Sequence, residues 1–370
     1  MGFLKRTLIL GLATSAVKAQ GGTPNYTQPD IDSGKALQDL SRIAKENALK
    51  RLSSSSSECT ADNVRVRKEW HVNPLRLSSQ NVLTPSRSMF DSFGLLHYYQ
   101  TPYVHNSVYF LLFHRVYIWL FEEKLRTVCG YTGTFPYWEW GLDCGGVEQS
   151  PLFDGSPTSM GGNGERVNGS QGMFPGGTGG GCVKEGPFSN YTVNLGPLTA
   201  RNPLAHNPRC LKRDLNTQIC RASASLKNTT EVMLESPNVE LFQANLQGDF
   251  RYPESRKWGF SVHGGGHFII AGDPGSDFYF SPLEPAFYLH HGQIDRMYFV
   301  WQNIDWENRQ DVAGTITMMN RPPSRNGTLD DVVDMEPLGG AYTLGEMLDT
   351  TNGNTPTLDT VVVSTRRTPL

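Results

Sequence analysis

The histidines of this sequence are clustered. The chain has nine histidines, and seven of them fall in two stretches. The first histidine group is His97, His105 and His114, and the second histidine group is His263, His267, His290 and His291. A single core histidine is usually an ordinary hydrogen-bonded residue, but packing does not require two such groups. Because neutral imidazole is the commonest side-chain metal ligand, the pattern predicts two neighbouring metal sites.

The second histidine group contains a pair with the spacing of a helical metal site. His263 and His267 are four residues apart, so on a helix their side chains lie one above the other. The three residues between them are glycines, and each costs a helix about 1 kcal/mol relative to alanine. Bonds to a metal ion could offset that cost. The missing side chains would also leave the approach to the metal open.

The first histidine group cannot lie on one straight helix. His105 and His114 are nine residues apart, which would place them on opposite faces of a helix. Either His105 precedes the helix that carries His114, or one of the two is not a ligand. Pro102 and Asn106 favour the first alternative, because proline interrupts a helix and asparagine often caps the start of the next.

The donor set favours copper over other metals. A di-iron carboxylate site would need several glutamates and Glu-x-x-His pairs, and no such pair occurs. A non-haem iron triad needs a carboxylate ligand, and a zinc hydrolase of the His-Glu-x-x-His kind needs that motif, which is also absent. Imidazole suits both oxidation states of copper. We therefore expect two copper ions, which could bind dioxygen between them.

Around these histidines the sequence resembles a known family, the type 3 copper proteins, which are tyrosinases, catechol oxidases and haemocyanins. Residues 105–115 (HNSVYFLLFHR), with Glu122 further on, are similar to the family's first copper signature. Residues 284–295 (EPAFYLHHGQID) are similar to the second, and 136–140 (PYWEW) to another family motif. The resemblance covers about 65–306 and is closest to short secreted fungal polyphenol oxidases.

The resemblance implies a role for each of these residues. Each copper would have three histidine ligands: His97, His105 and His114 for copper A, and His263, His267 and His291 for copper B. His290 would stand beside the copper B ligands without binding the metal, and Asp295 would orient a ligand imidazole. Arg115 and Glu122 would be buried ion-pair partners. Glu284 departs from the family pattern, which has aspartate at this position.

The resemblance also implies the reaction, in which phenols or o-diphenols become o-quinones and dioxygen is reduced to water. Gly264 presents no side chain above copper B, and Phe278 falls where relatives carry a gate residue. Glu254 could act in catalysis by holding a water that deprotonates a phenol. Because Gly264 cannot hold a water and Phe278 narrows the approach, we expect o-diphenol oxidation to exceed monophenol hydroxylation.

Other functions are compatible with parts of this pattern. A dedicated tailoring oxidase for a phenolic or peptide secondary metabolite would use the same site. An oxygen carrier would bind dioxygen there without turnover, but carriers of this family are large assemblies. A secreted structural protein without copper would leave the six matched histidines unexplained.

The elements that position these residues are predicted to be mainly helical. Helical periodicity and capping residues predict four helices, at 33–52, 85–97, 108–126 and 285–302. Residues 141–181 contain fourteen glycines and predict one long surface loop. The expected fold is therefore a mainly α helical bundle that holds a dinuclear copper site and carries long irregular loops.

The N-terminus has the pattern of a signal peptide. Lys5 and Arg6 precede an apolar stretch at 8–17, far shorter than the roughly 20 residues of a spanning helix. The small residues of Val17-Lys18-Ala19 suit cleavage. We therefore expect a protein of the secretory pathway. Its predicted segments are a signal peptide at 1–19, an N-terminal helix and linker at 20–60, the copper domain at 61–320 and a polar tail at 321–370.

Two further features suit that compartment. Five Asn-x-Ser/Thr triplets are potential glycosylation sites: Asn25, Asn168, Asn190, Asn228 and Asn326. Six cysteines allow up to three disulfides, and one between Cys144 and Cys182 would pin the glycine-rich loop.

The overall charge of the chain narrows the classes of molecule that it could bind. The chain has 33 Lys+Arg and 36 Asp+Glu, a formal net charge of −3, which argues against nucleic acid. The sequence also shows no stretch long enough to span a membrane. The expected partners are dioxygen and a small phenol, while the oligomeric state stays open.

Overall fold

The structure is a computed structural model that describes residues 24–54, 85–167 and 174–350. The predicted signal peptide, Cys59 and Asn168 lie outside the described residues. Within the described ranges, no helix is both long enough and apolar enough to cross a lipid bilayer. The predicted mainly α class is confirmed, because strands are few and short.

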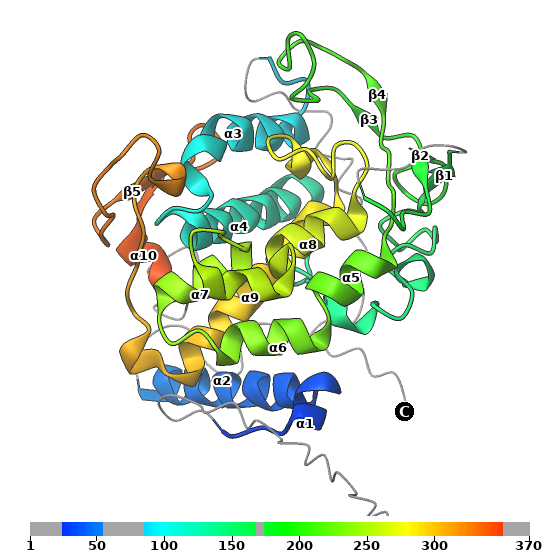
Figure 1. The fold of residues 1–370 in the computed structure, drawn as a ribbon. Coiled ribbons are helices and arrows are strands. Elements are labelled where there is room, and N and C mark those ends of the chain that lie inside the picture. Colours follow the sequence, from blue (N-terminus) through cyan, green and yellow to red (C-terminus); the bar gives the residue numbers. More distant parts are fainter. Residues whose placement is uncertain (1–23, 55–84, 168–173, 351–370) are drawn as a thin grey trace, which may run out of the picture.

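Four helices form the centre of the molecule and carry six of the seven clustered histidines (Figure 1). They are α3 (Met89–Val104), α4 (Phe110–Cys129), α8 (Ser261–Ile270) and α9 (Ala286–Ile304). Helix α9 packs against both α4 and α8, and α3 packs against α4. Buried side chains occupy most positions of α4 and α9 because other elements cover them on several sides, as expected for helices apolar nearly all round.

Two N-terminal helices lie beneath this centre in Figure 1: α1 (Gln28–Asp32) and α2 (Lys35–Ser54). The predicted helix at 33–52 is confirmed. The four apolar residues whose spacing predicted the helix are buried: Leu37, Leu40, Ala44 and Ala48. Through this face α2 packs along α9, so it supports from behind the helix that carries His290 and His291.

Three short helices surround α8 and were not predicted from the sequence. They are α5 (Thr217–Ser223), α6 (Leu226–Leu234) and α7 (Val239–Gln247). Each begins after a side-chain N-cap, namely Asn216, Ser225 or Asn238. Helices α5 and α7 pack directly against α8.

Asn228, in the first turn of α6, corrects one predicted glycosylation site. The side chain is 8% exposed, and its Nδ2 atom donates a hydrogen bond to the carbonyl of Ala222 at 2.7 Å. A glycan attached to that nitrogen would need space that this buried position does not offer in the folded chain. Asn25, Asn190 and Asn326 are exposed, and glycosylation at these three stays a prediction.

The glycine-rich segment is more ordered than predicted. Where one loop was expected at 141–181, the chain forms short elements: η3 (Trp140–Leu142), η4 (Val147–Gln149), and an antiparallel pair of β1 (Gly164–Arg166) and β2 (Gly180–Val183). A second pair, β3 (Thr192–Val193) and β4 (Arg209–Cys210), follows. The sequence left the pairing of the cysteines open, and the disulfide considered between Cys144 and Cys182 does not form. Cys144 pairs with Cys220 on α5, and Cys182 pairs with Cys210 on β4.

The helix expected at 85–97 extends further than predicted. Pro102 was expected to interrupt the chain, but α3 continues through it to Val104. Proline is tolerated there because it lies in the last turn, where a missing backbone N–H removes at most one helical hydrogen bond. The extension matters because it carries the chain from His97 to His105 in a fixed geometry.

Part of the predicted polar tail is packed against the core. Here β5 (Val332–Asp334) pairs with β6 (Ala341–Thr343), and α10 (Leu344–Leu348) packs on α4. Six apolar side chains of this region are buried: Val333, Met335, Leu338, Leu344, Met347 and Leu348. Their spacing across turns and short elements gave no periodic signal in the sequence. The remaining short helices are η5 (Pro253–Trp258), η6 (Ser281–Leu283), η7 (Trp306–Asn308) and η8 (Met318–Asn320).

Candidate metal centre

The structure brings the seven histidines together in two adjoining groups. Within each histidine group, the nitrogen atoms that could bind a metal lie within 4.8 Å of one another. The rings of His114 and His291 stack with their centroids 4.3 Å apart, which places the two groups in direct contact. His267 is partly buried, and the other six histidines are buried.

The first histidine group is assembled from α3, the loop after it and α4. His97 lies on α3, and His105 is the C-cap of the same helix, with extended backbone angles of φ −117° and ψ 142°. Helix α4 begins at Phe110 and carries His114. The prediction that His105 precedes the helix of His114 is therefore confirmed. The break between the helices turns two positions nine residues apart toward one point.

Backbone carbonyls hold the imidazoles of the first histidine group. Each Nδ1 lies within hydrogen-bond distance of one carbonyl oxygen: that of Tyr279 at 2.9 Å for His97, Thr101 at 3.2 Å for His105, and Phe110 at 2.7 Å for His114. A carbonyl oxygen can only accept, so each Nδ1 carries the hydrogen and each Nε2 keeps its lone pair. Metal-binding histidines are usually held in this way.

Two Nε2 lone pairs of the first histidine group form no hydrogen bond with the described residues. The Nε2 atoms of His97 and His114 are buried without a hydrogen-bond partner among the described residues. Leaving a buried polar atom unpaired costs about 1–3 kcal/mol, which a metal ion between the rings would remove. The donor set therefore fits a metal held by three imidazoles.

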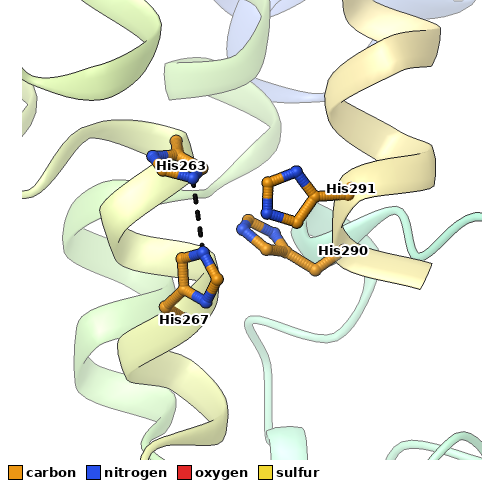
Figure 2. Close-up of side chains that lie close together, drawn as sticks. All are labelled: His263, His267, His290 and His291. Atoms are coloured by element: carbon orange, nitrogen blue, oxygen red, sulfur yellow. Dashed lines mark hydrogen bonds between the residues drawn. The ribbon is translucent and has the colours of Figure 1, made fainter. Parts of the chain in front are cut away.

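The second histidine group combines α8 and α9 (Figure 2). His263 and His267 lie one above the other on α8, as their spacing predicted, and their Nε2 atoms are 3.3 Å apart. Two atoms bound at about 2.0–2.1 Å to one ion, as in zinc–imidazole sites, stand about 3.3 Å apart at a tetrahedral angle. The two side chains therefore already have the separation of two ligands on one ion.

His290 and His291 face this pair from α9. Both ring nitrogens of both residues are buried and have no hydrogen-bond partner within the described part of the chain. His291 stacks on His114, whereas His290 lies toward Trp140, with ring centroids 5.3 Å apart. Within the second histidine group, His291 is therefore the member that stacks on the first group, and His290 lies further from the first group. The choice of His291 as the ligand stays a prediction.

The three glycines of α8 lie in different surroundings, so the absence of a side chain has a different consequence at each position. A Cβ atom at Gly266 would stand 2.2 Å from the ring of His290, and one at Gly265 would stand 2.5 Å from the Cβ of Ser223. At these two positions only glycine permits the observed packing. A Cβ at Gly264 would meet only Phe260, at 3.5 Å, which is an ordinary contact. Gly264 instead lines a cavity and leaves it wider.

Burial lowers the pKa of all seven histidines, because the protein interior solvates the charged imidazolium poorly. Desolvation lowers the pKa of His105 to about 4 and that of His267 to about 3. The other five have pKa values well below the usual 6.5, with desolvation again the largest cause. The rings are therefore neutral at physiological pH, which is the form that binds a metal.

Arg115 and Asp295 join the two ligand-bearing helices α4 and α9. The Arg115 Nε atom donates to the Asp295 carboxylate at 2.6 Å, and both side chains are largely buried. Asp295 was expected to orient a ligand imidazole, but its recorded bond is to Arg115 instead. Arg115 also donates to the backbone carbonyls of Met347 and Leu348 on α10. The predicted buried ion pair of Arg115 is thus confirmed, and Glu122 pairs with Arg126 at 2.6 Å.

A fully buried ion pair at the start of α9 was missed by the sequence analysis. Arg213 donates to both carboxylate oxygens of Glu284, at 2.6 and 3.0 Å. Its remaining nitrogen donates to carbonyls of the glycine-rich segment, including that of Met160. Glu284 also accepts from the backbone N–H of Ala286 at 2.9 Å. The departure from aspartate at position 284 was a visible signal, but its distant partner Arg213 was not.

A cavity of about 260 Å³ opens beside the metal centre. Residues that line it include His105, His263, His267, Gly264 and Phe278, so it reaches both histidine groups. The ring of Phe278 lies 4.5 Å from that of His105 and is 45% exposed. The predicted gate residue is therefore at the cavity, although it covers a histidine of the first group and not one of the second.

Glu254 does not share this cavity. Its side chain is exposed on η5, and it is not among the residues that line the cavity. Glu254 precedes His263 by nine residues, which suggested that the two side chains are close. The chain turns between η5 and α8, and the Glu254 carboxylate lies outside the cavity lining. The structure therefore gives no support to Glu254 as the residue that holds a water for phenol deprotonation.

Comparison with known proteins decides the family of the chain. Residues 87–304 match the common central domain of tyrosinase, which is more than half of the sequence and includes all seven clustered histidines. The chain belongs to the tyrosinase family. This family implies a dinuclear copper site, and the two histidine groups fit such a site.

Individual tyrosinase-family relatives extend the match to most of the chain. Tyrosinase P of Aspergillus terreus is 34% identical over 375 residues, which cover 95% of this chain and 98% of that protein. An oxidase of Aspergillus hancockii is 37% identical over 278 residues, covering 70% and 96%. A solved polyphenol oxidase variant from Thermothelomyces thermophila is 34% identical, with a TM-score of 0.77 over 87% of this chain and 97% of its own. The protein is accordingly a type 3 copper oxidoreductase that acts on phenols.

Proposed function

We propose that this chain oxidises o-diphenols to o-quinones with dioxygen, using two copper ions held by the two histidine groups. The ligands are three from each group: His97, His105 and His114, and His263, His267 and His291. The observation that carries the proposal is that each group gathers one ring nitrogen per histidine within 4.8 Å, and that the buried Nε2 atoms of His97, His114 and His291 lack a hydrogen-bond partner among the described residues.

The side chains around the metal pair prepare it for this reaction. Copper, when bound, supplies the transfer of electrons from the phenol to dioxygen. Burial keeps the ligand imidazoles neutral, and the carbonyl of Phe110 holds the ring of His114 with its Nε2 lone pair free. The cavity admits an aromatic ring beside His105 and His263. Two o-diphenols each lose two electrons and two protons, and one dioxygen becomes two waters.

Preference for o-diphenols over monophenols is part of the proposal. A monophenol must first lose a proton and then present its ortho carbon, so it needs a positioned base or water and room to turn. Gly264 offers no polar group, Glu254 lies outside the cavity, and Phe278 stands over His105. An o-diphenol carries two hydroxyls that can reach copper directly and needs less help from the protein.

Oxygen consumption with a matched pair of substrates tests this preference. We expect 4-methylcatechol to be oxidised well above the rate of 4-methylphenol, and Phe278→Ala to widen the range of accepted substrates. Comparable initial rates on the two compounds without a lag would show that the residues around the cavity do not set the preference. If neither compound is consumed by copper-loaded protein, the oxidase function itself is wrong.

A dedicated tailoring role in secondary metabolism is the second candidate. One relative is N-acetyl-6-hydroxytryptophan oxidase of Emericella nidulans, 32% identical over 343 residues that cover 80% of this chain and 92% of that protein. That name shows that the family includes oxidases for a defined phenolic metabolite. A kcat/KM for one such compound far above those for simple catechols would favour the tailoring role.

We also propose that the protein passes through the secretory pathway. The two disulfides, Cys144–Cys220 and Cys182–Cys210, support an oxidising compartment. Cleavage after residue 19, glycans on exposed asparagines such as Asn190, and the domain division at 61–320 belong to this proposal. Mass spectrometry of the protein from its native host tests it, since an intact N-terminus without glycans would contradict secretion.

A further inference from the structure

Two phenylalanine rings line the cavity, and a third packs against them. Phe260 precedes α8, and Phe268 follows His267 on the same helix. Phe174, from the glycine-rich segment, packs against both. The three ring centroids are 4.6–5.0 Å apart, with all pairs inclined to each other, and we call this group the phenylalanine wall. Such inclined contacts are the stable arrangement of aromatic rings.

The phenylalanine wall presents apolar surface to the cavity. Phe260 and Phe268 both line it, and Phe260 is 40% exposed. Gly264 lies one helical turn from both Phe260 and Phe268. A side chain at this position would contact Phe260 and cover part of it, so glycine leaves the ring accessible. A large ring left exposed at the mouth of a cavity favours contact with an apolar group of a ligand.

The described lining of the same cavity contains no lysine or arginine that could pair with a carboxylate. Asp277 is the one formally charged residue among the described residues that line it. Both of its carboxylate oxygens already accept backbone N–H groups, from Leu198 at 2.7 Å and from Tyr279 and Phe280 at 2.9 and 3.1 Å. A carboxylate group on a substrate would therefore lose water without gaining an ion pair from a lining side chain.

We propose that the phenylalanine wall is a subsite for a second aromatic ring of the substrate, so that the preferred substrate is an uncharged o-diphenol with an aryl substituent. This inference rests on the proposed function, because the first ring must lie beside His263 to be oxidised. The second ring then lies over Phe260 and Phe268.

Steady-state kinetics of the copper-loaded protein with three probes tests the subsite: 4-phenylcatechol, 4-methylcatechol and 3,4-dihydroxyphenylacetate. We expect kcat/KM to be highest for 4-phenylcatechol and lowest for the charged probe. Phe260→Ala should lower kcat/KM for 4-phenylcatechol about three- to tenfold, the range that one aromatic contact provides, and leave that for 4-methylcatechol within about twofold. Phe260→Tyr keeps a ring and should retain the preference.

Phe250→Ala is the matched control, because Phe250 is 54% exposed and does not line the cavity. It should change no ratio between the probes. Titration calorimetry of 4-phenylcatechol with metal-free wild type and Phe260→Ala should show the same three- to tenfold difference in affinity. Equal kcat/KM for the two uncharged probes in the wild type, or a loss in Phe260→Ala that is the same for both, would overturn the subsite. Failure to oxidise any probe would instead contradict the proposed function.

Discussion

The two histidine groups are built differently although both offer imidazoles to a metal. In the first group every Nδ1 is held by a backbone carbonyl, so the Nε2 lone pairs are aimed before any metal arrives. In the second group, neither ring nitrogen of His290 or His291 has a partner among the described residues. Their position depends on packing, with Gly266 pressed against His290 and His291 stacked on His114.

This difference indicates a preorganised site beside one that a metal completes. Carbonyls fixed in the main chain cannot be removed by a side-chain substitution, so the first group should tolerate changes nearby. The second group is held by a close approach of α8 to α9, which a single methyl group can disturb. We therefore expect substitutions around the second group to have the larger effects on metal content.

The largest expected effect is loss of a ligand in the second histidine group. His291→Ala should abolish oxidase activity and reduce copper to about one ion per chain, because His263 and His267 alone cannot hold the ion. Metal analysis and oxygen consumption measure both effects. His290→Ala is the control and should retain most of the copper. If the two variants behave in the opposite way, the ligand is His290.

Acid should destabilise the metal-free protein. The unfolded chain binds protons on its histidines at a pKa near 6.5, whereas the folded pKa is about 4 for His105 and about 3 for His267. Below pH 6.5 the unfolded state therefore binds more protons, and stability falls until the pH reaches the folded pKa values. Each such histidine contributes about 1.4 kcal/mol per pH unit.

Urea unfolding of the metal-free protein at pH 7.5 and pH 5.0 measures this effect, with a lower midpoint expected at pH 5.0. Above pH 6.5 the histidines should contribute no further pH dependence. Copper should also be released in acid, since protonated imidazole does not bind a metal. An unchanged midpoint at pH 5.0 would mean that the histidines are not buried as neutral rings.

A methyl group at Gly266 should disturb the second histidine group. Gly266→Ala places a Cβ 2.2 Å from the ring of His290, so α8 and α9 must separate or the ring must move. Overpacking of this kind costs about 1–3 kcal/mol of unfolding free energy and should lower the copper content. Denaturant unfolding and metal analysis measure the two effects.

Gly264→Ala provides the matched control on the same helix. Its Cβ would meet only Phe260 at 3.5 Å, and alanine favours a helix over glycine by up to about 1 kcal/mol. This variant should keep its copper and be as stable as the wild type or more so. Equal losses in Gly264→Ala and Gly266→Ala would show that the contact with His290 is not what requires glycine.

The smallest effect is expected beside the first histidine group. The Thr101 hydroxyl donates to the carbonyl of His97 at 2.6 Å, while the Thr101 carbonyl accepts from His105. Thr101→Val removes the hydroxyl and keeps the carbonyl, so we expect about 1 kcal/mol of destabilisation and two coppers per chain. Thr101→Ser should resemble the wild type. Loss of copper in Thr101→Val alone would contradict a first group held by its main chain.

The residues of the metal centre could be predicted because their chemistry and local spacing are visible in the chain. His263 and His267 share a helix face by their interval alone, and the interval between His105 and His114 required a break that the structure shows before Phe110. The periodic helices also followed from pattern, as the burial of Leu37 and Leu40 on α2 shows.

Contacts between distant segments could not be predicted in this way. Arg213 and Glu284 are far apart in the sequence, and an arginine gives no sign of its partner. The pairing of Cys144 with Cys220 likewise depends on where α5 packs. Asp295 lies one helical turn from His291, which suggested a bond to an imidazole, but the better geometry was offered by Arg115 on another helix.

The central claim is that the two histidine groups hold a pair of copper ions, and the metal content of the folded protein tests it most directly. Elemental analysis of purified wild-type protein, reconstituted with copper and freed of excess metal, should give two coppers per chain. His114→Ala and His263→Ala, one from each group, should each lower that value by about one. One copper per chain in the wild type, or zinc retained in preference to copper, would contradict the account.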